Sequence, residues 1–223
     1  MHHSIINLND INEKIKNTKE KNINLTKKPT LIAVSKTFNT EDINPLVDFG
    51  HIHFGENRVQ EALDKWTKIK EKNSTVKLHL IGKLQTNKVK FAVKIFDYIH
   101  TVDSIKLARK ISNEENKLKK KIKLFIQVNI GLEEQKSGVS ENNLKELIEE
   151  CSRLNLSVIG LMCIPPNDNN SKNYFKKMKE LGSQYSLSEL SMGMSSDYIE
   201  AIEEGSTYVR IGSKIFGERA KQF

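Results

Sequence analysis

Hydrophobic positions along the chain recur with two different periods, and the two periods alternate from one segment to the next. Eight short apolar runs have the composition of buried strands, and they lie at residues 30–35, 51–55, 77–82, 98–102, 124–130, 157–162, 186–191 and 208–212. The run at 186–191 is the weakest of the eight. Apolar residues recur with a helical period in an opening segment at 9–22 and then between the strands, at 40–48, 58–72, 86–95, 104–120, 140–154, 171–183 and 195–204.

This alternation of strand and helix predicts the fold class. A strand followed by a helix, repeated along the chain, indicates parallel strands joined by crossover helices. Eight strands that are almost continuously hydrophobic favour a closed (β/α)8 barrel of the TIM type over an open doubly wound sheet. The segment 9–22 adds a helix before the barrel, and no linker or low-complexity stretch divides the chain. We therefore expect an α/β barrel that forms a single domain over residues 1–223.

Composition argues against a membrane protein. Hydrophobic residues make up 37% of the chain and charged residues 29%, and no apolar run approaches the roughly 18 residues that a membrane span needs. Residues 1–10 lack the layout of a signal peptide. We therefore expect a cytoplasmic protein without a membrane partner.

The formal charge of +8 raises the question of a nucleic-acid partner, because basic surfaces bind phosphate backbones. The positive charge comes mostly from lysine, and the one dense run, at 117–121, follows a helical pattern without interleaved aromatic residues. A solvated helix end explains that run better, so nucleic acid is not an expected partner.

The cysteines and histidines do not form a recognisable metal site. Cys151 and Cys163 belong neither to a CxxC pair nor to a zinc pattern, and we expect two reduced thiols. His51 and His53 alternate along one predicted strand, but no third ligand has suitable spacing, and we predict no metal site.

Polar residues with possible chemistry follow the strands, and in barrels of this kind the functional residues gather at the carboxyl ends of the strands. Lys36 directly follows the first strand, and Arg210 lies in the eighth, which neighbours the first once the barrel closes. The loops after strands seven and eight contain SMGMSSD (191–197) and RIGSKIFG (210–217). Their glycines let an anion approach the backbone, and Ser191 and Ser213 can add hydroxyl donors. These loops are a candidate phosphate site.

A lysine beside a phosphate site predicts a particular cofactor chemistry. Partial burial and the positive charge of Arg210 both disfavour the ammonium form of Lys36, and a neutral amine is a nucleophile for an aldehyde. An amine, a phosphate loop and an arginine together describe a site for pyridoxal 5′-phosphate (PLP) held as a Schiff base. The alternative is a strand-end lysine whose stem packs on the protein and whose ammonium reaches water, with Arg210 in an internal ion pair.

Seven segments resemble those of a known family. They are AVSKTF (33–38), FGENRVQE (54–61), HLIGKLQTNK (79–88), KSG (136–138), GLMCIP (160–165), LSMGMSSDYIEAI (190–202) and VRIGSKIFGER (209–219). In order and spacing they are similar to the pyridoxal phosphate homeostasis proteins, single-domain relatives of the alanine racemase N-terminal barrel. The resemblance extends from Thr30 to Arg219. It departs from the family at KTFNTED (36–42), where a proline is usual, and at Lys83, where one is common.

The resemblance implies roles for individual residues. It implies a barrel that binds PLP through a Schiff base to Lys36, with Arg210 facing the pyridine nitrogen and Asn57 bordering the cofactor. It places Ser191, Gly212 and Ser213 around the phosphate and Met192 among the cofactor contacts. His79, Gln85 and Asn87 fall in the third motif, where the resemblance carries over a position but no role.

Three functions remain open on this basis. An arginine against the pyridine nitrogen keeps it unprotonated and weakens the ring as an electron sink, and none of the five tyrosines has a position that argues for a second acid or base. The resemblance implies a protein that buffers or delivers PLP without established turnover, as a monomer or weak dimer with PLP-dependent apo-enzymes as partners. A weak amino-acid racemase or related PLP enzyme is the alternative, and a basic nucleic-acid binder is the third possibility.

Overall fold

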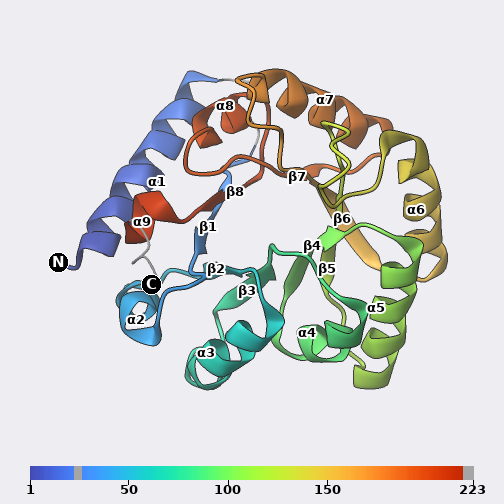
Figure 1. Ribbon diagram of the computed structural model, residues 1–223. Helices are drawn as coiled ribbons and strands as arrows, with labels where there is room; N and C mark the ends of the chain where they lie inside the picture. Colours follow the sequence, from blue (N-terminus) through green and yellow to red (C-terminus); the bar gives the residue numbers. More distant parts are fainter. Residues whose placement is uncertain (23–26, 218–223) are drawn as a thin grey trace.

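The eight strands form a closed parallel barrel in the computed structural model, which describes residues 1–22 and 27–217 (Figure 1). In chain order the strands are β1 (Thr30–Val34), β2 (His53–Glu56), β3 (Lys77–Leu80), β4 (Tyr98–Val102), β5 (Lys123–Gln127), β6 (Ser157–Met162), β7 (Glu189–Ser191) and β8 (Tyr208–Ile211). Each strand pairs in parallel with the next, and β8 pairs with β1, with Arg210 opposite Ile32. The predicted (β/α)8 barrel is confirmed.

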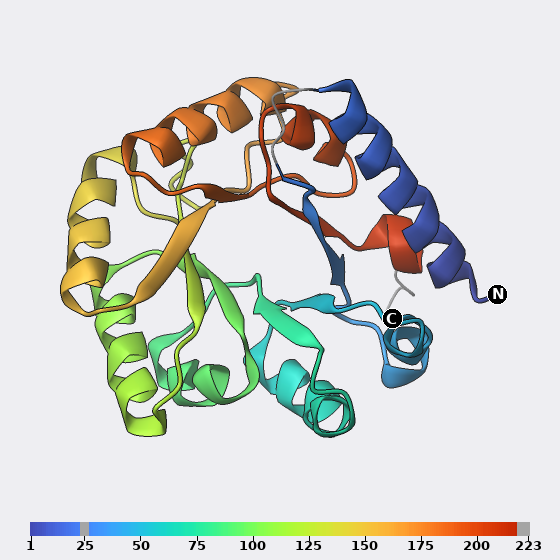
Figure 2. The same ribbon diagram turned by 180° about the vertical axis from the view of Figure 1, so that it is seen from behind.

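Helices surround the barrel on the outside (Figures 1 and 2). They are α1 (His3–Lys21), α2 (Thr40–Asp48), α3 (Val59–Lys72), the short 3-10 helix η1 (Thr86–Lys88), α4 (Val89–Ile95), α5 (Ile105–Leu118), α6 (Glu141–Arg153), α7 (Ser171–Gln184), α8 (Tyr198–Glu203) and α9 (Ser213–Phe216). Figure 2 shows α1 lying along α8 and α9, on the side of the barrel where β8 meets β1. The amide of Asn7 donates to the backbone oxygen of Ile215 at 3.0 Å and links α1 to α9.

Three elements begin two or three residues later than the sequence pattern predicts. The strand predicted from residue 51 begins at His53, because the N–H of His51 donates to the backbone oxygen of Leu46 and still belongs to the end of α2. The strand predicted from 186 begins at Glu189, because Ser186 has a φ of 56° and turns the chain. The helix predicted from 195 begins at Tyr198, after a polar turn.

Other helices also differ from the pattern. α1 begins at His3 rather than at residue 9, and the ring of His2 accepts a hydrogen bond from the backbone N–H of Ser4 at its start. The helix predicted over 86–95 is divided into η1 and α4. The short helix α9 after β8 was not predicted at all, because four residues are too few to show a helical period.

Apolar side chains pack in two separate layers. The larger layer lies between the helices and the outside of the barrel and includes Trp66, Phe54 and Phe96. The smaller one fills the barrel interior with Ile32, Val34, Tyr98, Phe125, Met162 and Tyr208. The interior also contains fully or almost fully buried polar side chains, among them His79, His100, Ser191 and Arg210. Such groups are costly to bury unless they form hydrogen bonds. The barrel interior therefore has to supply hydrogen-bond partners as well as apolar contacts.

Other expectations can also be compared with the fold. Cys151 and Cys163 are buried, free cysteines, and burial raises the pKa of each thiol to about 12. Within residues 1–22 and 27–217 no helix combines the length and the apolar character that crossing a membrane requires. Arg219, where the family resemblance ends, lies outside the described residues.

Candidate cofactor-binding site

A cavity of about 570 Å³ lies at the carboxyl ends of the strands, within the size range of small-ligand sites. Its polar lining consists of Lys36, Asn57, Ser195, Ser196, Arg210 and Ser213. Its remaining lining consists of Val34, Phe38, Ile81, Gly82, Ile164, Met194, Gly212 and Gly217. The lining therefore joins loops from both halves of the chain, which meet only because the barrel closes between β8 and β1.

Five of the seven predicted cofactor contacts line this one cavity: Lys36, Asn57, Arg210, Gly212 and Ser213. The other two, Ser191 and Met192, are fully buried and do not belong to its lining. A direct contact between either of these two and a ligand therefore stays a prediction.

The three residues whose position alone was carried over from the resemblance lie apart from the cavity lining. His79 is fully buried inside the barrel, whereas Gln85 and Asn87 are exposed after β3. The sequence segment that contains all three thus supplies one interior residue and two surface residues.

Arg210 lines the cavity and is held in place by hydrogen bonds to the barrel interior. Its Nη1 donates to Oγ of Ser191 at 2.7 Å, and its Nη2 donates to the backbone oxygen of Cys163 at 2.9 Å. Burial lowers the pKa of Arg210, while the negative charge of Asp197 raises it. Because a guanidinium stays protonated in proteins, Arg210 is a permanent cation of fixed orientation in the lining of the cavity.

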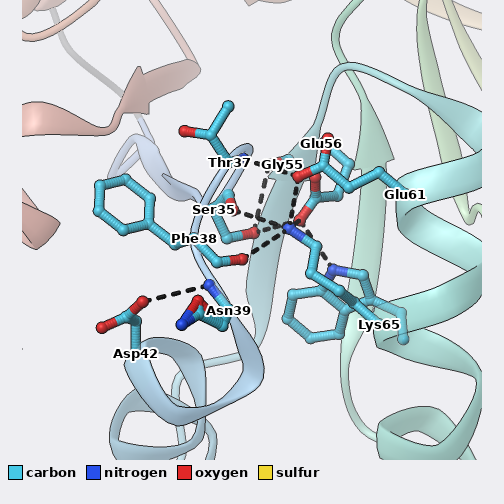
Figure 3. A network of polar contacts seen from close by, with 10 residues as sticks. Ser35, Thr37, Phe38, Asn39, Asp42, Gly55, Glu56, Glu61 and Lys65 are labelled. Carbon is cyan, nitrogen blue, oxygen red and sulfur yellow. Dashed lines mark hydrogen bonds and ion pairs between the residues drawn. The ribbon is translucent and has the colours of Figure 1, made fainter. Parts of the chain in front are cut away.

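The loop that carries Lys36 is fastened to the barrel by Lys65 of α3 (Figure 3). The Nζ of Lys65 donates to the backbone oxygens of Ser35 at 2.9 Å and Phe38 at 3.0 Å, on either side of Lys36. It also forms ion pairs with Glu56 and Glu61, both at 2.8 Å. One ammonium group thereby holds both ends of the four-residue loop.

Two carboxylates complete this attachment (Figure 3). The buried Oε1 of Glu56 accepts from Oγ of Ser35 at 2.8 Å and from Nε1 of Trp66 at 2.9 Å. Burial raises the pKa of Glu56, while the ion pair with Lys65 lowers it. Oε1 of Glu61 accepts from the backbone N–H of Thr37 at 2.6 Å. Thr37 has a φ of 70°, a backbone conformation that residues other than glycine rarely adopt. The attachment thus holds a strained turn next to Lys36.

Gly82 is a site residue that the sequence analysis missed. A Cβ atom at Gly82 would lie 2.2 Å from the backbone oxygen of Asn57, so only glycine lets the end of β3 pack this closely on the loop after β2. The available signal was a glycine at the end of the apolar run 77–82. The Oδ1 of Asn57 is buried and has no hydrogen-bond partner among the residues that the structure describes.

Ser195 and Ser196 also line the cavity, in a loop that the sequence analysis selected without singling them out. Gly193 has a φ of 88° and turns the chain after β7, and the N–H of Met194 donates to Oδ1 of Asp197 at 2.7 Å. Within the described part of the chain, the backbone N–H groups of Ser195 and Ser196 have no acceptor. The loop therefore offers hydroxyl and backbone donors to an anion.

Comparison with known proteins defines the class first. The model of the family described as alanine racemase, N-terminal domain, matches residues 6–220. This is the class that the closed barrel, the added N-terminal helix and the cavity at the carboxyl ends of the strands define.

Individual relatives then narrow the class to a family. The pyridoxal phosphate homeostasis protein of Aquifex aeolicus is 43% identical over 199 residues, which cover 85% of this chain and 86% of that protein. The protein of the same name from Vibrio cholerae is 39% identical over 224 residues, covering 96% of this chain and 95% of that one. The chain belongs to the family of pyridoxal phosphate homeostasis proteins.

A solved structure supports the same relationship at the level of the fold. PipY of Synechococcus elongatus, in a structure with PLP bound, superposes with a TM-score of 0.80 at 36% identity, covering 93% of this chain and 100% of that one. The structure of PipY without PLP gives a TM-score of 0.81 over the same shares.

Proposed function

We propose that this protein binds PLP covalently through Lys36 and stores or delivers the cofactor without converting an amino-acid substrate. The observation that carries the proposal is that Lys36, Arg210 and Asn57 line one cavity of a barrel whose relative PipY is described with PLP bound. In the covalent step, Nζ of Lys36 in its neutral form adds to the aldehyde carbon of PLP. A C=N bond forms and one water molecule leaves, so the step needs no oxidant or reductant.

The side chains around Lys36 fit this cofactor. The unpartnered Oδ1 of Asn57 is a buried acceptor that a hydroxyl or amine in the cavity would satisfy. Ser213 and the donors of Ser195 and Ser196 suit the phosphate. Gly212 lies so close to β1 that a Cβ atom would be 3.3 Å from the backbone oxygen of Val34, which keeps this side of the cavity open for a ligand.

The charge of Arg210 supports storage rather than turnover. Two N–H groups of Arg210 are bound to the barrel interior, and the residue is a permanent cation. A cation facing the pyridine nitrogen disfavours protonation of that nitrogen, and an unprotonated ring withdraws electrons less strongly. Weak racemisation of amino acids is the alternative function, and it would need a second acid or base across the ring from Lys36.

We also propose where the protein acts, in which oligomeric state, and with which partners. It acts in the cytoplasm as a single domain over residues 1–223, as a monomer or weak dimer, and it passes PLP to apo-enzymes that depend on the cofactor. What supports this part is the family to which the chain belongs, whose members are named for pyridoxal phosphate homeostasis.

Absorption spectroscopy tests the covalent site. Purified wild-type protein, Lys36→Ala and the control Lys83→Ala, which removes an exposed lysine near the same rim, are mixed with PLP, and the near-visible band of a Schiff base is recorded. Each sample is then reduced with borohydride and mapped by peptide mass. We expect a band and a reduced adduct at Lys36 in the wild type and the control, and neither in Lys36→Ala. An adduct spread over surface lysines would contradict the proposal.

A chirality assay tests the absence of turnover. PLP-loaded protein is incubated with L-alanine in deuterium oxide, and the D-enantiomer and α-deuteration are followed by chromatography and mass spectrometry. We expect no more of either than with free PLP. Racemisation that disappears in Lys36→Ala would replace storage with the alternative function.

A further inference from the structure

A continuous chain of hydrogen bonds crosses the barrel interior and ends at Arg210. Nδ1 of His53 lies 2.9 Å from Nε2 of His79, and Nδ1 of His79 lies 2.9 Å from Nε2 of His100. Nδ1 of His100 lies 2.8 Å from Oγ of Ser191, which accepts from Nη1 of Arg210 at 2.7 Å. The chain thus joins β2, β3, β4, β7 and β8, and connects His53 at the amino end of β2 with the cavity.

The hydrogen bonds of this chain have one direction, which Arg210 sets. A guanidinium can only donate, so Oγ of Ser191 is an acceptor toward Arg210. Within the described part of the chain, the other partner of that Oγ is Nδ1 of His100. If His100 donated to Ser191 as well, the hydroxyl proton would be buried without an acceptor, which is costly. The hydroxyl of Ser191 therefore donates to Nδ1 of His100.

The donor and acceptor nitrogens of each histidine then follow from those of its neighbour. With Nδ1 as an acceptor, neutral His100 carries its proton on Nε2 and donates to Nδ1 of His79. By the same argument His79 carries its proton on Nε2 and donates to Nδ1 of His53. His53 is half-buried and carries its own proton on Nε2.

Burial keeps the imidazole rings of the three histidines neutral. Complete burial lowers the pKa of His79 and of His100 well below the usual range, and the neighbouring positive charge of Arg210 acts on His100 in the same direction. Burial also lowers the pKa of His53; Lys77 and Lys123 add to this effect, whereas Asp97 opposes it.

Two aromatic rings fix the planes of the buried histidines. His79 stacks on Tyr98 with ring centroids 4.1 Å apart, and His100 stacks on Phe125 at 4.3 Å. The rings cannot rotate without losing these contacts, so the nitrogen atoms stay aligned with the chain.

We propose that His79 and His100 are positioning residues for Arg210: His100, oriented by His79, accepts the hydroxyl proton of Ser191, so the oxygen of Ser191 faces Arg210 and holds the guanidinium with its remaining donors available to the cavity. Ser191 then acts on a ligand through Arg210 rather than by direct contact. The proposal rests on the proposed function for the identity of the ligand, PLP, whereas the direction of the hydrogen bonds does not depend on it.

Nuclear magnetic resonance of histidine nitrogens tests the direction itself. Protein labelled with 15N in histidine is studied without and with PLP, and long-range 1H–15N spectra assign the tautomer of each ring. Substitution of single histidines assigns the signals. We expect His79 and His100 as neutral rings protonated on Nε2 at pH 7. An Nδ1–H tautomer or an imidazolium at either position would overturn the proposal, whatever the outcome for PLP.

Binding of PLP to matched variants tests the effect on Arg210. Ser191→Ala removes the oxygen that accepts from Arg210, and His100→Leu removes the nitrogen that accepts the hydroxyl proton of Ser191. His100→Asn keeps a side-chain oxygen close to the position of Nδ1. The control His51→Gln alters a ring whose hydrogen-bond partner, among the residues that the structure describes, is the backbone oxygen of His53 and not a member of the histidine chain. We expect the dissociation constant of PLP to rise about tenfold in Ser191→Ala, the effect of losing one hydrogen bond to a charged group. It should also rise in His100→Leu, where the hydroxyl of Ser191 loses the acceptor that orients it, with partial rescue in His100→Asn.

The results separate this inference from the proposed function. Equal affinities of all four variants and the wild type would overturn the positioning role, even with an intact adduct at Lys36. Failure of the wild type to form that adduct would overturn the proposed function and leave the tautomer result standing. If His100→Leu does not fold, the tautomers and Ser191→Ala decide the outcome.

Discussion

The Nζ atom of Lys65 lies 2.8 Å from Oε1 of Glu56, and this ion pair anchors the loop that carries the cavity lysine. The side chain of Lys65 is 11% exposed and that of Glu56 is fully buried. The same Nζ donates to the backbone oxygens of Ser35 and Phe38, on either side of Lys36 (Figure 3). The position of Lys36 in the cavity therefore depends on a charge in a neighbouring helix.

Replacing Lys65 by methionine tests this dependence. Lys65→Met leaves the carboxylate of Glu56 buried without its counter-charge, and breaking a buried pair in this way costs about 3 kcal/mol. We expect the free energy of unfolding in urea to fall by that amount. We also expect Lys36 to react more slowly with PLP, because the ends of its loop lose their donor.

Lys70→Met is the matched control for that experiment. Lys70 lies on the same helix and pairs with Asp97, which directly precedes β4 at the other end of the barrel. This variant should lose stability and keep the rate of adduct formation. Equal loss of rate in both variants would show that general destabilisation, rather than the loop attachment, controls Lys36.

A double-mutant cycle with Glu56→Gln tests the ion pair itself. Glutamine keeps an oxygen that can accept from Ser35 and Trp66 but removes the buried negative charge. The double variant Lys65→Met/Glu56→Gln should therefore be more stable than Lys65→Met alone, with a coupling energy of about 2 kcal/mol. Additive effects in urea denaturation would mean that the two charges do not interact.

Substitution of Asn57 is expected to weaken PLP binding with little effect on the stability of the fold. Its buried Oδ1 has no hydrogen-bond partner in residues 1–22 and 27–217, so removing it relieves an unsatisfied polar group. We expect Asn57→Ala to change the free energy of unfolding by no more than about 1 kcal/mol, and to weaken PLP binding about tenfold. Fluorescence titration with PLP and urea denaturation measure the two quantities, and a variant that loses stability but not affinity would contradict a ligand-binding role.

Stability should fall in acid because histidines are held neutral. Burial lowers the pKa of His51 from 6.5 to about 4, and it lowers the pKa values of His79 and His100 as well. Below pH 6.5 the unfolded chain therefore binds protons that the folded chain does not, so the stability present above pH 6.5 is lost as pH falls toward 4.

Urea denaturation at pH 7.5 and pH 5 measures this effect. His51 alone should account for about 2 kcal/mol of the loss at pH 5, at about 1.4 kcal/mol for each pKa unit. His51→Gln should lose correspondingly less stability between the two pH values than the wild type. An unchanged difference in His51→Gln would show that His51 titrates normally in the folded protein.

The sequence alone determined the barrel and much of its cavity. Hydrophobic period reports which positions are buried and in which kind of element, and the closure of eight parallel strands then brings the residues after β1 and those of β8 together. For this reason Lys36 and Arg210, 174 positions apart in the printed sequence, could be assigned to one cavity.

Only the tertiary structure decided how these residues are held. The hydrophobic periodicity of the sequence predicts that Lys65 lies on a helix and that Ser191 and His100 lie on strands. It does not indicate which buried polar groups form a hydrogen bond with each other. Those pairings depend on strand register and on rotamers. They connect Lys65 to the loop around Lys36 and His100 to Ser191, 91 positions away. Burial of a polar group requires a partner, and the fold determines which partner is within reach.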